Sequence, residues 1–306
     1  MSIAVFHEHP DWNEPLFAEM SRRGLNWTSV DASKPGFDPA YVGEWDVLIN
    51  RMSPSAWTRG HMSAMLQTPE FLRVAESSGI PVINGPEAYA YELSKRKQLE
   101  LFRREGVRHP EGRPFLNQEE IMGAALDLTF PVLIKPNIGG SGAGIEEFGT
   151  WEQLKAAVEA GFGESLGPDG TGLVQEKLSA RGNSVVRIEV LDGEFLYGIR
   201  LRLMPGSFNL CPADYCEPGS EDASDLVEGY TPPGHLVEEA LRIIDAVGAD
   251  LGGVEYLISD RDGEAYFYDV NVLSNFVADA IRVVGFDPFA KLVDFIEGRA
   301  RRTVSR

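Results

Sequence analysis

A glycine-rich loop between two strand-like segments constrains the fold of this chain more than any other feature. The run FPVLIKPNIGGSGAGIEEF, residues 130–148, starts as an apolar strand that ends in Lys135 and Pro136, and then opens into glycine, alanine and serine. Glycines let a main chain approach a ligand closely and leave successive N–H groups free to bind phosphate oxygens. Taken alone, the loop fits a phosphate-covering lid and an ordinary glycine-rich hairpin equally well.

Two widespread phosphate-binding motifs are excluded here. A Walker loop needs a lysine and a serine or threonine directly after its last glycine, whereas Gly144 is followed by Ile145 and Glu146. A dinucleotide-binding fingerprint opens directly into a helix, whereas the residues after this loop, IEEF, are typical of a strand. The remaining functional interpretation is a flexible lid between two strands that closes over a polyphosphate.

The rest of the chain divides into units by its strand and helix patterns. Up to about residue 92, strand-like runs such as IAVFHEH and WDVLINRM alternate with helical runs such as EPLFAEMSRRG, which predicts a layered α/β unit. A helix capped by Ser94 and ending at Gly106 follows. Late in the chain, two antiparallel hairpins are predicted, with turns at Asp192–Gly193 and near Asp262–Gly263. The fold class predicted from these patterns is α/β followed by α+β.

Oxygen-bearing side chains gather on the last predicted hairpin. Glu255 lies on one strand, and Asp269 and Asn271 are two residues apart on the other, so the latter two face the same side of the sheet. Three oxygen ligands suit magnesium, although a D-x-N pattern alone also fits solvated carboxylates at a sheet edge. Lys135 ends an apolar strand, where an inward-pointing ammonium is costly unless an anion meets it. Together with the glycine loop, these residues favour a nucleotide–magnesium site.

The order of these motifs resembles the ATP-grasp superfamily. The resemblance runs from Lys95 to about Ala278 through PVLIKPNIGGSGAG, LVQEKL, VVRIEVLDG, IRLR, GGVEYL and YFYDVNVLSNF. Within that superfamily, the chain is most similar to the branch of ribosomal-protein glutamate ligases and lysine-biosynthesis carrier-protein ligases. The resemblance implies an ATP-grasp fold that binds nucleotide between two α+β subdomains. The implied units are a pre-ATP-grasp α/β domain at 1–92, a central lid subdomain at 93–175 and a C-terminal subdomain with the metal site at 176–306.

The resemblance also implies roles for individual residues. Lys95 and Lys135 would contact the phosphates of ATP, and backbone groups of an interdomain hinge would read the adenine. Glu255, Asp269 and Asn271 match the magnesium ligands, with Asp269 standing where glutamate is commoner. The implied nucleotide contacts outside the two lysines are Gly140, Ser141, Gly142 and Gly144 in the lid, and Gln175, Glu176, Lys177 and Leu178 at the hinge.

The implied reaction is carboxylate–amine ligation through an acyl phosphate. This chemistry builds negative charge on phosphoryl and tetrahedral oxygens, so it needs placed cations more than a nucleophile. Arg187 is the first candidate, with Arg202, preferred over Arg200, as the second; the alternative for the latter two is a surface cross-strand pair. Relatives carry further acidic and basic residues that this chain lacks, which points to a specialised acceptor. The candidate substrate-binding residues are Asn209, Ser274, Asn275 and Arg51.

Composition bears on partners and location. The formal charge of −19, with no separate basic cluster, predicts repulsion from nucleic acid and anionic membranes. No window approaches the ~18 uninterrupted apolar residues of a membrane span, and a cytoplasmic location is expected. Small carboxylate and amine substrates are favoured over an acidic protein tail, and the aromatic-rich first domain offers a surface for a homodimer. The alternatives to a ligase are an ATP-grasp kinase and a nucleotide-binding regulator without turnover.

Overall fold

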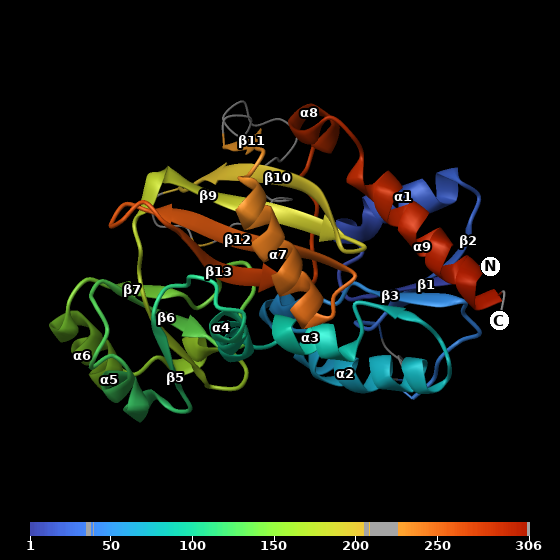
Figure 1. The fold of residues 1–306 in the computed structure, drawn as a ribbon. Helices are drawn as coiled ribbons and strands as arrows, with labels where there is room; N and C mark the ends of the chain where they lie inside the picture. The colour runs from blue at the N-terminus through green and yellow to red at the C-terminus, as the bar shows by residue number, and fades with distance from the viewer. Residues whose placement is uncertain (35–37, 39, 205–207, 209–225, 305–306) are drawn as a thin grey trace.

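Three β-sheets organise the chain. The structure, a computed structural model, describes residues 1–34, 38, 40–204, 208 and 226–304. Within these ranges the sheets are separate along the sequence, with strand orders β2-β1-β3-β4, β5-β8-β6-β7 and β11-β10-β9-β12-β13 (Figure 1). The mixed α/β and α+β fold class is therefore confirmed.

The N-terminal sheet is parallel and lies between two helical layers. It contains β1 (Ser2–His7), β2 (Asn26–Asp31), β3 (Val47–Asn50) and β4 (Val82–Ile83). β1 and β3 are buried on both faces, as parallel strands under crossover helices usually are. Sequence patterns missed β2, an edge strand whose residues are half-buried or exposed. The helices of this unit are α1 (Glu14–Arg22), α2 (Met62–Ser77) and α3 (Pro86–Glu92).

A proline inside a helix often interrupts it, but the second helix is continuous. α2 runs through Pro69, which forfeits one backbone hydrogen bond. The helix continues because its inward side buries Met65, Phe71 and Leu72 in a core with Phe6 and other residues of the sheet.

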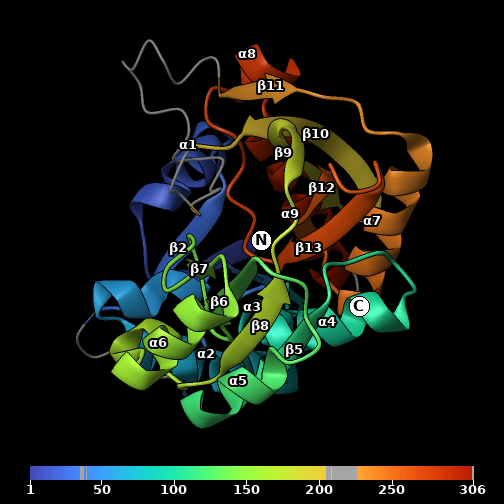
Figure 2. The ribbon, with the colours of Figure 1, turned by 90° about the vertical axis from the view of Figure 1, so that its left-hand side faces the viewer.

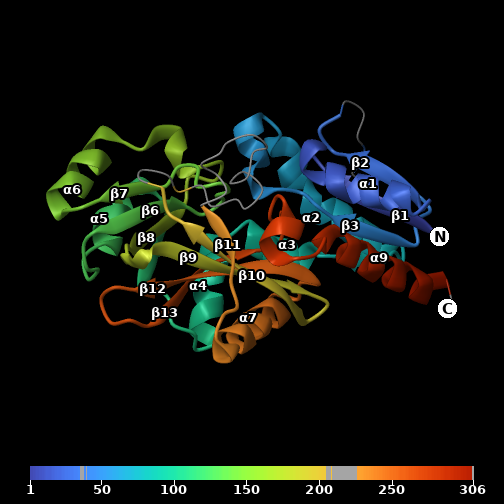
Figure 3. The same cartoon turned by 90° about the horizontal axis from the view of Figure 1, so that it is seen from above.

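The last helix of the chain packs on the first sheet. α9 (Pro288–Val304) contacts α1, β1 and β3, as Figures 1 and 3 show. Its Leu292 and Ile296 are fully buried in one core with Ile3 and Val5. α9 therefore packs with the N-terminal sheet, although it belongs to the segment 176–306, which was expected to form one C-terminal unit.

The middle sheet is antiparallel and carries the glycine loop. It consists of β5 (Gly112–Phe115), β8 (Gly172–Glu176), β6 (Val132–Pro136) and β7 (Glu146–Phe148). The loop joins the adjacent strands β6 and β7, so its predicted position between two strands is confirmed. Helices α5 (Ile121–Ala124) and α6 (Trp151–Ala160) pack on this sheet, and Figure 2 shows this unit from the side that lies on the left in Figure 1.

The C-terminal sheet contains both predicted hairpins. Its strands are β9 (Ala180–Leu191), β10 (Glu194–Arg202), β11 (Val227–Gly229), β12 (Leu251–Ser259) and β13 (Ala265–Asn271). Asp192 and Gly193 both have positive φ at the first turn, which explains their place there. Helix α7 (Gly234–Val247) covers one face, with α4 (Lys95–Arg104) beside it, and α8 (Ala280–Val284) lies near β10 and β11. None of the helices described here is long and apolar enough to cross a membrane.

One buried asparagine joins the N-terminal and C-terminal sheets. The Asn84 side chain accepts hydrogen bonds from the main-chain N–H groups of Asp250 (2.8 Å) and Leu251 (3.1 Å). It donates to the carbonyls of Leu251 (2.7 Å) and Val272 (2.8 Å). All four bonds saturate one amide, so Asn84 fixes the end of β4 against the strands that carry Glu255 and Asn271.

Replacing Asn84 with alanine is expected to lower the free energy of unfolding by about 3 kcal/mol or more, because buried main-chain groups lose their partners. Urea unfolding measures the loss. Asn183→Ala is the matched control, because Asn183 also has positive φ (51°, against 54° for Asn84) but is exposed and makes one side-chain bond. An equal loss of unfolding free energy in the two variants would show that the effect comes from backbone conformation. It would contradict the role of the Asn84 side chain in joining the two sheets.

Candidate active site

One cavity of about 220 Å³ is lined by all three units. The middle sheet supplies the glycine loop and β8, the C-terminal sheet supplies β9, β12 and β13, and the N-terminal unit supplies Trp12, Ser53 and Ser55. Most residues singled out from the sequence meet here although they are far apart along the chain. The predicted residues that line the cavity are Lys95, Lys135, Gly140, Ser141, Gly142, Gln175, Glu176, Lys177, Leu178, Arg187, Glu255, Asp269, Asn271 and Asn275.

Two lysines bring positive charge to the cavity. Lys95, the first residue of α4, reaches across to the Asp269 carboxylate and forms an ion pair with it. Lys135, near the end of β6, has its ammonium 5.7 Å from the centre of the Tyr268 ring. The pKa of Lys135 is lowered to about 8, chiefly by burial and also by the nearby Lys95, while the carboxylates of Asp269 and Glu255 oppose this shift. A bound anion would offset this unfavourable environment.

Glu255, Asp269 and Asn271 present oxygen atoms to the same cavity. Glu255 on β12 lies directly opposite Asp269 on β13. The Asn271 amide nitrogen donates to Glu255 Oε1 at 3.2 Å, which leaves the amide oxygen for a ligand. Two carboxylates and an amide oxygen fit a hard divalent cation such as magnesium. The described part of the chain holds no group of three or more His, Cys, Asp and Glu side chains that could bind a metal ion. The candidate site is not such a group, because its third ligand, Asn271, is an amide.

A β-bulge changes which residues of β13 face the cavity. Glu255 pairs with Asp269, yet the next residue, Tyr256, pairs with Phe267, so Tyr268 is an extra residue on β13. Tyr268 and Asp269 consequently both line the cavity, although they are consecutive. Strict alternation along the strand would have placed Tyr268 on the opposite face.

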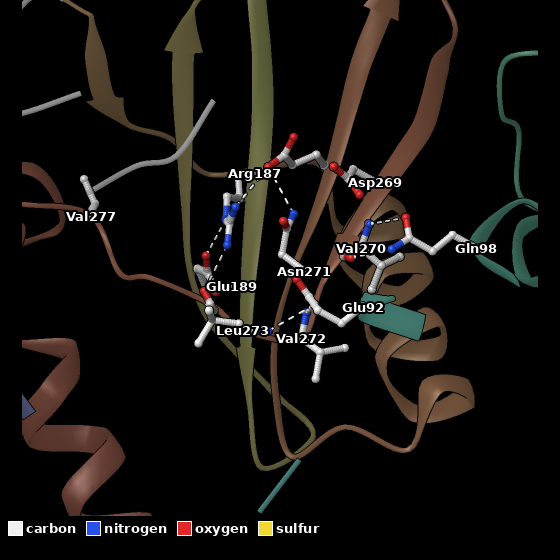
Figure 4. A network of polar contacts seen from close by, with 12 residues as sticks. Glu92, Gln98, Arg187, Glu189, Asp269, Val270, Asn271, Val272, Leu273 and Val277 are labelled. Atoms are coloured by element: carbon white, nitrogen blue, oxygen red, sulfur yellow. Dashed lines mark hydrogen bonds and ion pairs between the residues drawn. The ribbon is translucent and has the colours of Figure 1, made fainter. Parts of the chain in front are cut away.

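Arg187 is held by two buried carboxylates. Its Nε donates to Glu189 Oε1 (2.5 Å), Nη1 to Glu255 Oε1 (2.9 Å) and Nη2 to Ser274 Oγ (3.0 Å). Figure 4 shows Arg187 and Glu189 together, with Asn271 and Asp269 on β13. Burial alone would lower the pKa of Arg187, but Glu189 and Glu255 raise it above its usual value. Burial raises the pKa of Glu255, and Arg187 opposes that shift. The guanidinium is thus a fixed, permanent cation at the cavity wall.

The chain is similar in sequence to known ligases. No protein-family model matches the chain. A D-alanine–D-alanine ligase of Corynebacterium aurimucosum is 29% identical over 217 residues, covering 66% of this chain but only 56% of that ligase. A probable alpha-L-glutamate ligase 2 of Shewanella frigidimarina is 24% identical over 239 residues, covering 77% of this chain and 73% of the relative.

Solved structures resemble the chain over nearly its whole length. A RimK domain protein ATP-grasp from Sphaerobacter thermophilus superposes with a TM-score of 0.69 at 19% identity, covering 97% of this chain and 99% of that one. The ATP-grasp ligase PsnB, complexed with a minimal precursor, gives a TM-score of 0.66 at 17% identity, covering 97% and 98%. The chain has the ATP-grasp fold. The fold inferred from its motifs is confirmed.

Two N–H groups of the predicted hinge segment have partners within the protein. The N–H groups of Glu176 and Lys177 donate to the carbonyls of Glu111 (2.8 Å) and Pro131 (2.9 Å). Among the described residues, the N–H of Leu178 has no such acceptor, so it is the N–H of these three that remains available to a ligand. The Glu176 carboxylate accepts from Thr129 N (3.0 Å) and Arg261 Nη1 (3.2 Å), so each of its two oxygens has a partner within the protein.

Arg200 and Arg202 require a correction. Residues paired across antiparallel strands share a face, and Arg200 pairs with Val186 whereas Arg187 pairs with Ile199. Arg200 therefore projects from the face opposite Arg187, where it bonds Glu228 Oε1 at 2.7 Å. Arg202 lies on that same face and is exposed. Neither lines the ATP-grasp cavity, so the alternative of a surface location describes them better.

Other predicted residues stand behind the cavity wall. Arg51 is buried and donates to Asn13 Oδ1 (3.0 Å), Ser274 O (2.7 Å) and Asn275 Oδ1 (3.0 Å), so its guanidinium holds a loop and does not face a substrate. Ser274 is fully buried between Arg187 and Glu189. Gly144 is absent from the lining because it packs on the backbone of Ser165. Asn209 lies outside the described residues.

The sequence reasoning missed several residues of the site. Glu92 lines the cavity, accepts main-chain N–H bonds from Val272 and Leu273, and has its pKa raised to about 7 by burial. Glu189 is fully buried beside Arg187. A signal for Glu189 was present, because it stands two residues from Arg187 on a strand and must share its face. Nothing in the sequence pattern marked Glu92, Trp12, Ser53 or Ser55.

Proposed function

We propose that this protein is an ATP- and magnesium-dependent carboxylate–amine ligase. The single observation that carries the proposal is the convergence of Lys95, Lys135, Glu255, Asp269 and Asn271 in one cavity. Cations for the phosphates and oxygen ligands for a divalent ion are the parts that phosphoryl transfer requires. The relatives of the chain include a D-alanine–D-alanine ligase and a probable alpha-L-glutamate ligase, which supports the same activity.

The proposed reaction has two balanced steps. An oxygen of the donor carboxylate attacks the γ-phosphorus of ATP, the bond to the bridging oxygen breaks, and ADP leaves with the acyl phosphate formed. The amine then attacks the acyl carbon, the carbon–oxygen bond to phosphate breaks, and the amine loses a proton as the amide forms. A poor leaving group, oxide, is thereby exchanged for phosphate.

The residues of the chain would act mainly through charge and position. Lys95 and Lys135 would hold the ATP phosphates, and the loop at 139–144 would exclude water above them. Glu255, Asp269 and Asn271 would hold magnesium, which supplies charge neutralisation between phosphate oxygens when bound. Arg187, fixed by Glu189 and Glu255, would stabilise the negative oxygens of the acyl phosphate and of the tetrahedral intermediate.

The substrate class that we propose is a small amino acid or a peptide with a terminal carboxylate. The relatives of the chain include a D-alanine–D-alanine ligase, and the ligase PsnB was solved in complex with a minimal precursor. The chain's own charge of −19 disfavours docking of an acidic protein tail.

A screen of amino-acid pairs tests the proposal. Full-length protein with ATP and magnesium is expected to release ADP with at least one pair, and mass spectrometry should detect the condensed product. ADP release that needs the carboxylate but no amine would identify a kinase. Nucleotide binding without ADP release across the screen would contradict the ligase and favour a regulator.

A further inference from the structure

Two serines of the N-terminal unit form part of the cavity wall. Ser53 precedes and Ser55 lies within a short 3₁₀ helix, Pro54–Arg59, and both side chains are buried at the cavity surface. Arg59 fixes the pair, since its Nη1 donates to Ser55 Oγ at 3.0 Å while its Nη2 donates to the buried Glu8 carboxylate at 2.5 Å. The serines are therefore anchored by other residues of the N-terminal unit.

Counting hydrogens leaves one hydroxyl without an acceptor. The two oxygens are 2.7 Å apart, so one hydroxyl donates to the other. Ser53 Oγ also accepts from the N–H of Ser55 (3.1 Å), and Ser55 Oγ accepts from Arg59. Neither of those outside donors can accept, so the second hydroxyl hydrogen finds no acceptor among the residues that the structure describes. Leaving a buried donor unpaired is costly, so a ligand with an acceptor oxygen is expected beside it.

The surroundings place this donor near the phosphate end of the cavity. A Cβ atom built on Gly140 would lie 2.6 Å from the Ser55 Cβ, so the glycine loop touches the pair. A Cβ on the preceding Gly139 would lie 3.8 Å from Lys95 Cε. The glycine loop therefore lies between the serine pair on one side and Lys95 on the other. This places the pair at the phosphate end of the cavity and not at the hinge near Leu178.

We propose that the Ser53–Ser55 pair donates its spare hydroxyl hydrogen to an oxygen of the transferred phosphoryl group, first as the γ-phosphate of ATP and then in the acyl phosphate. The inference rests on the proposed ligase function and adds a phosphoryl contact from the N-terminal unit. Either serine can supply the hydrogen, because removing one frees the other hydroxyl from the mutual bond. The pair should therefore donate one hydrogen bond to the ligand, and either serine alone should be able to donate it.

Calorimetric binding of Mg–AMP-PNP and Mg–ADP tests this inference. In Ser53→Ala/Ser55→Ala, affinity for AMP-PNP is expected to fall about tenfold, because a hydrogen bond to a charged group is lost, while affinity for ADP stays unchanged. Each single variant should lose less than about threefold, so the two changes are non-additive. Thr58→Val is the control, because its hydroxyl lies in the same 3₁₀ helix but donates to Ser55 O (2.8 Å) and does not line the cavity.

The outcomes separate this inference from the proposed function. If the wild type binds neither nucleotide, both are overturned. If the wild type binds both nucleotides, only this inference is overturned when the double variant keeps the wild-type ratio of the two affinities, including the case in which both affinities fall equally. A raised KM for the carboxylate substrate in that variant would then assign the hydroxyl to the acyl donor. If the double variant does not fold, Ser53→Ala/Ser55→Cys, with a weaker thiol donor, is subject to the same comparison.

Discussion

Replacing Asp269 with asparagine is expected to reduce ADP release by about 100-fold or more at saturating ATP. The carboxylate pairs with Lys95 and faces Glu255 directly across the hairpin. An amide removes one of only two anionic oxygen donors in the proposed magnesium site and leaves Lys95 without its partner. A coupled assay of ADP release at several magnesium concentrations measures the loss.

Asp260→Asn is the matched control for this variant. Asp260 belongs to the same subdomain, but it is exposed and lies 3.5 Å from the Arg181 guanidinium, where an ion pair contributes little. The control should keep wild-type turnover. Wild-type turnover in Asp269→Asn would remove Asp269 from the metal site and contradict the proposed ligand set.

Gly253→Ala is expected to lower kcat by about 100-fold while leaving the KM for ATP nearly unchanged. A Cβ atom at this position would lie 2.6 Å from both Nε and Nη2 of Arg187, because the guanidinium lies against β12 where Gly253 has no side chain. Alanine must push the guanidinium away from Glu255 and Ser274, and a displacement of about 1 Å at a reacting centre can cost about 100-fold in rate. Steady-state kinetics and a crystal structure of the variant measure both effects.

The adjacent glycine provides the control for Gly253. A Cβ on Gly252 would point to the other face of β12 and lie 2.6 Å from Ile244 Cδ1 in the core under α7. Gly252→Ala should lower the melting temperature but retain kcat in the folded protein. An equal loss of kcat in both variants would show that any disturbance of β12 matters, and would contradict a specific role of Gly253 in placing Arg187.

Local signals in the sequence were sufficient for much of the fold. Ser94 caps α4 through the N–H of Lys97, and Gly106, just beyond the helix, has positive φ as its C-terminal position requires. The Asp192–Gly193 turn fixed the first late hairpin in the same way. Each of these features depends on a few neighbouring residues, so the chemistry of those residues predicts it.

Features that depend on register or tertiary packing could not be predicted in this way. Alternation puts Arg200 and Arg202 on one face, but only the pairing with β9 decides that this face is opposite Arg187. Nothing local shows that Arg51 would be enclosed by Asn13 and Asn275 instead of facing a substrate. The bulge at Tyr268 likewise arises from the pairing of β12 with β13.

The packing of α9 determines how the molecule can open. Because the final helix returns to the first sheet, one continuous apolar core holds side chains of β1, β9, β10 and α9, whereas the middle sheet has a core of its own. The N-terminal and C-terminal sheets therefore form one packed body, and the middle sheet forms a second one. Access to the cleft should therefore depend on rotation of that second body alone, about the two chain crossings that tether it.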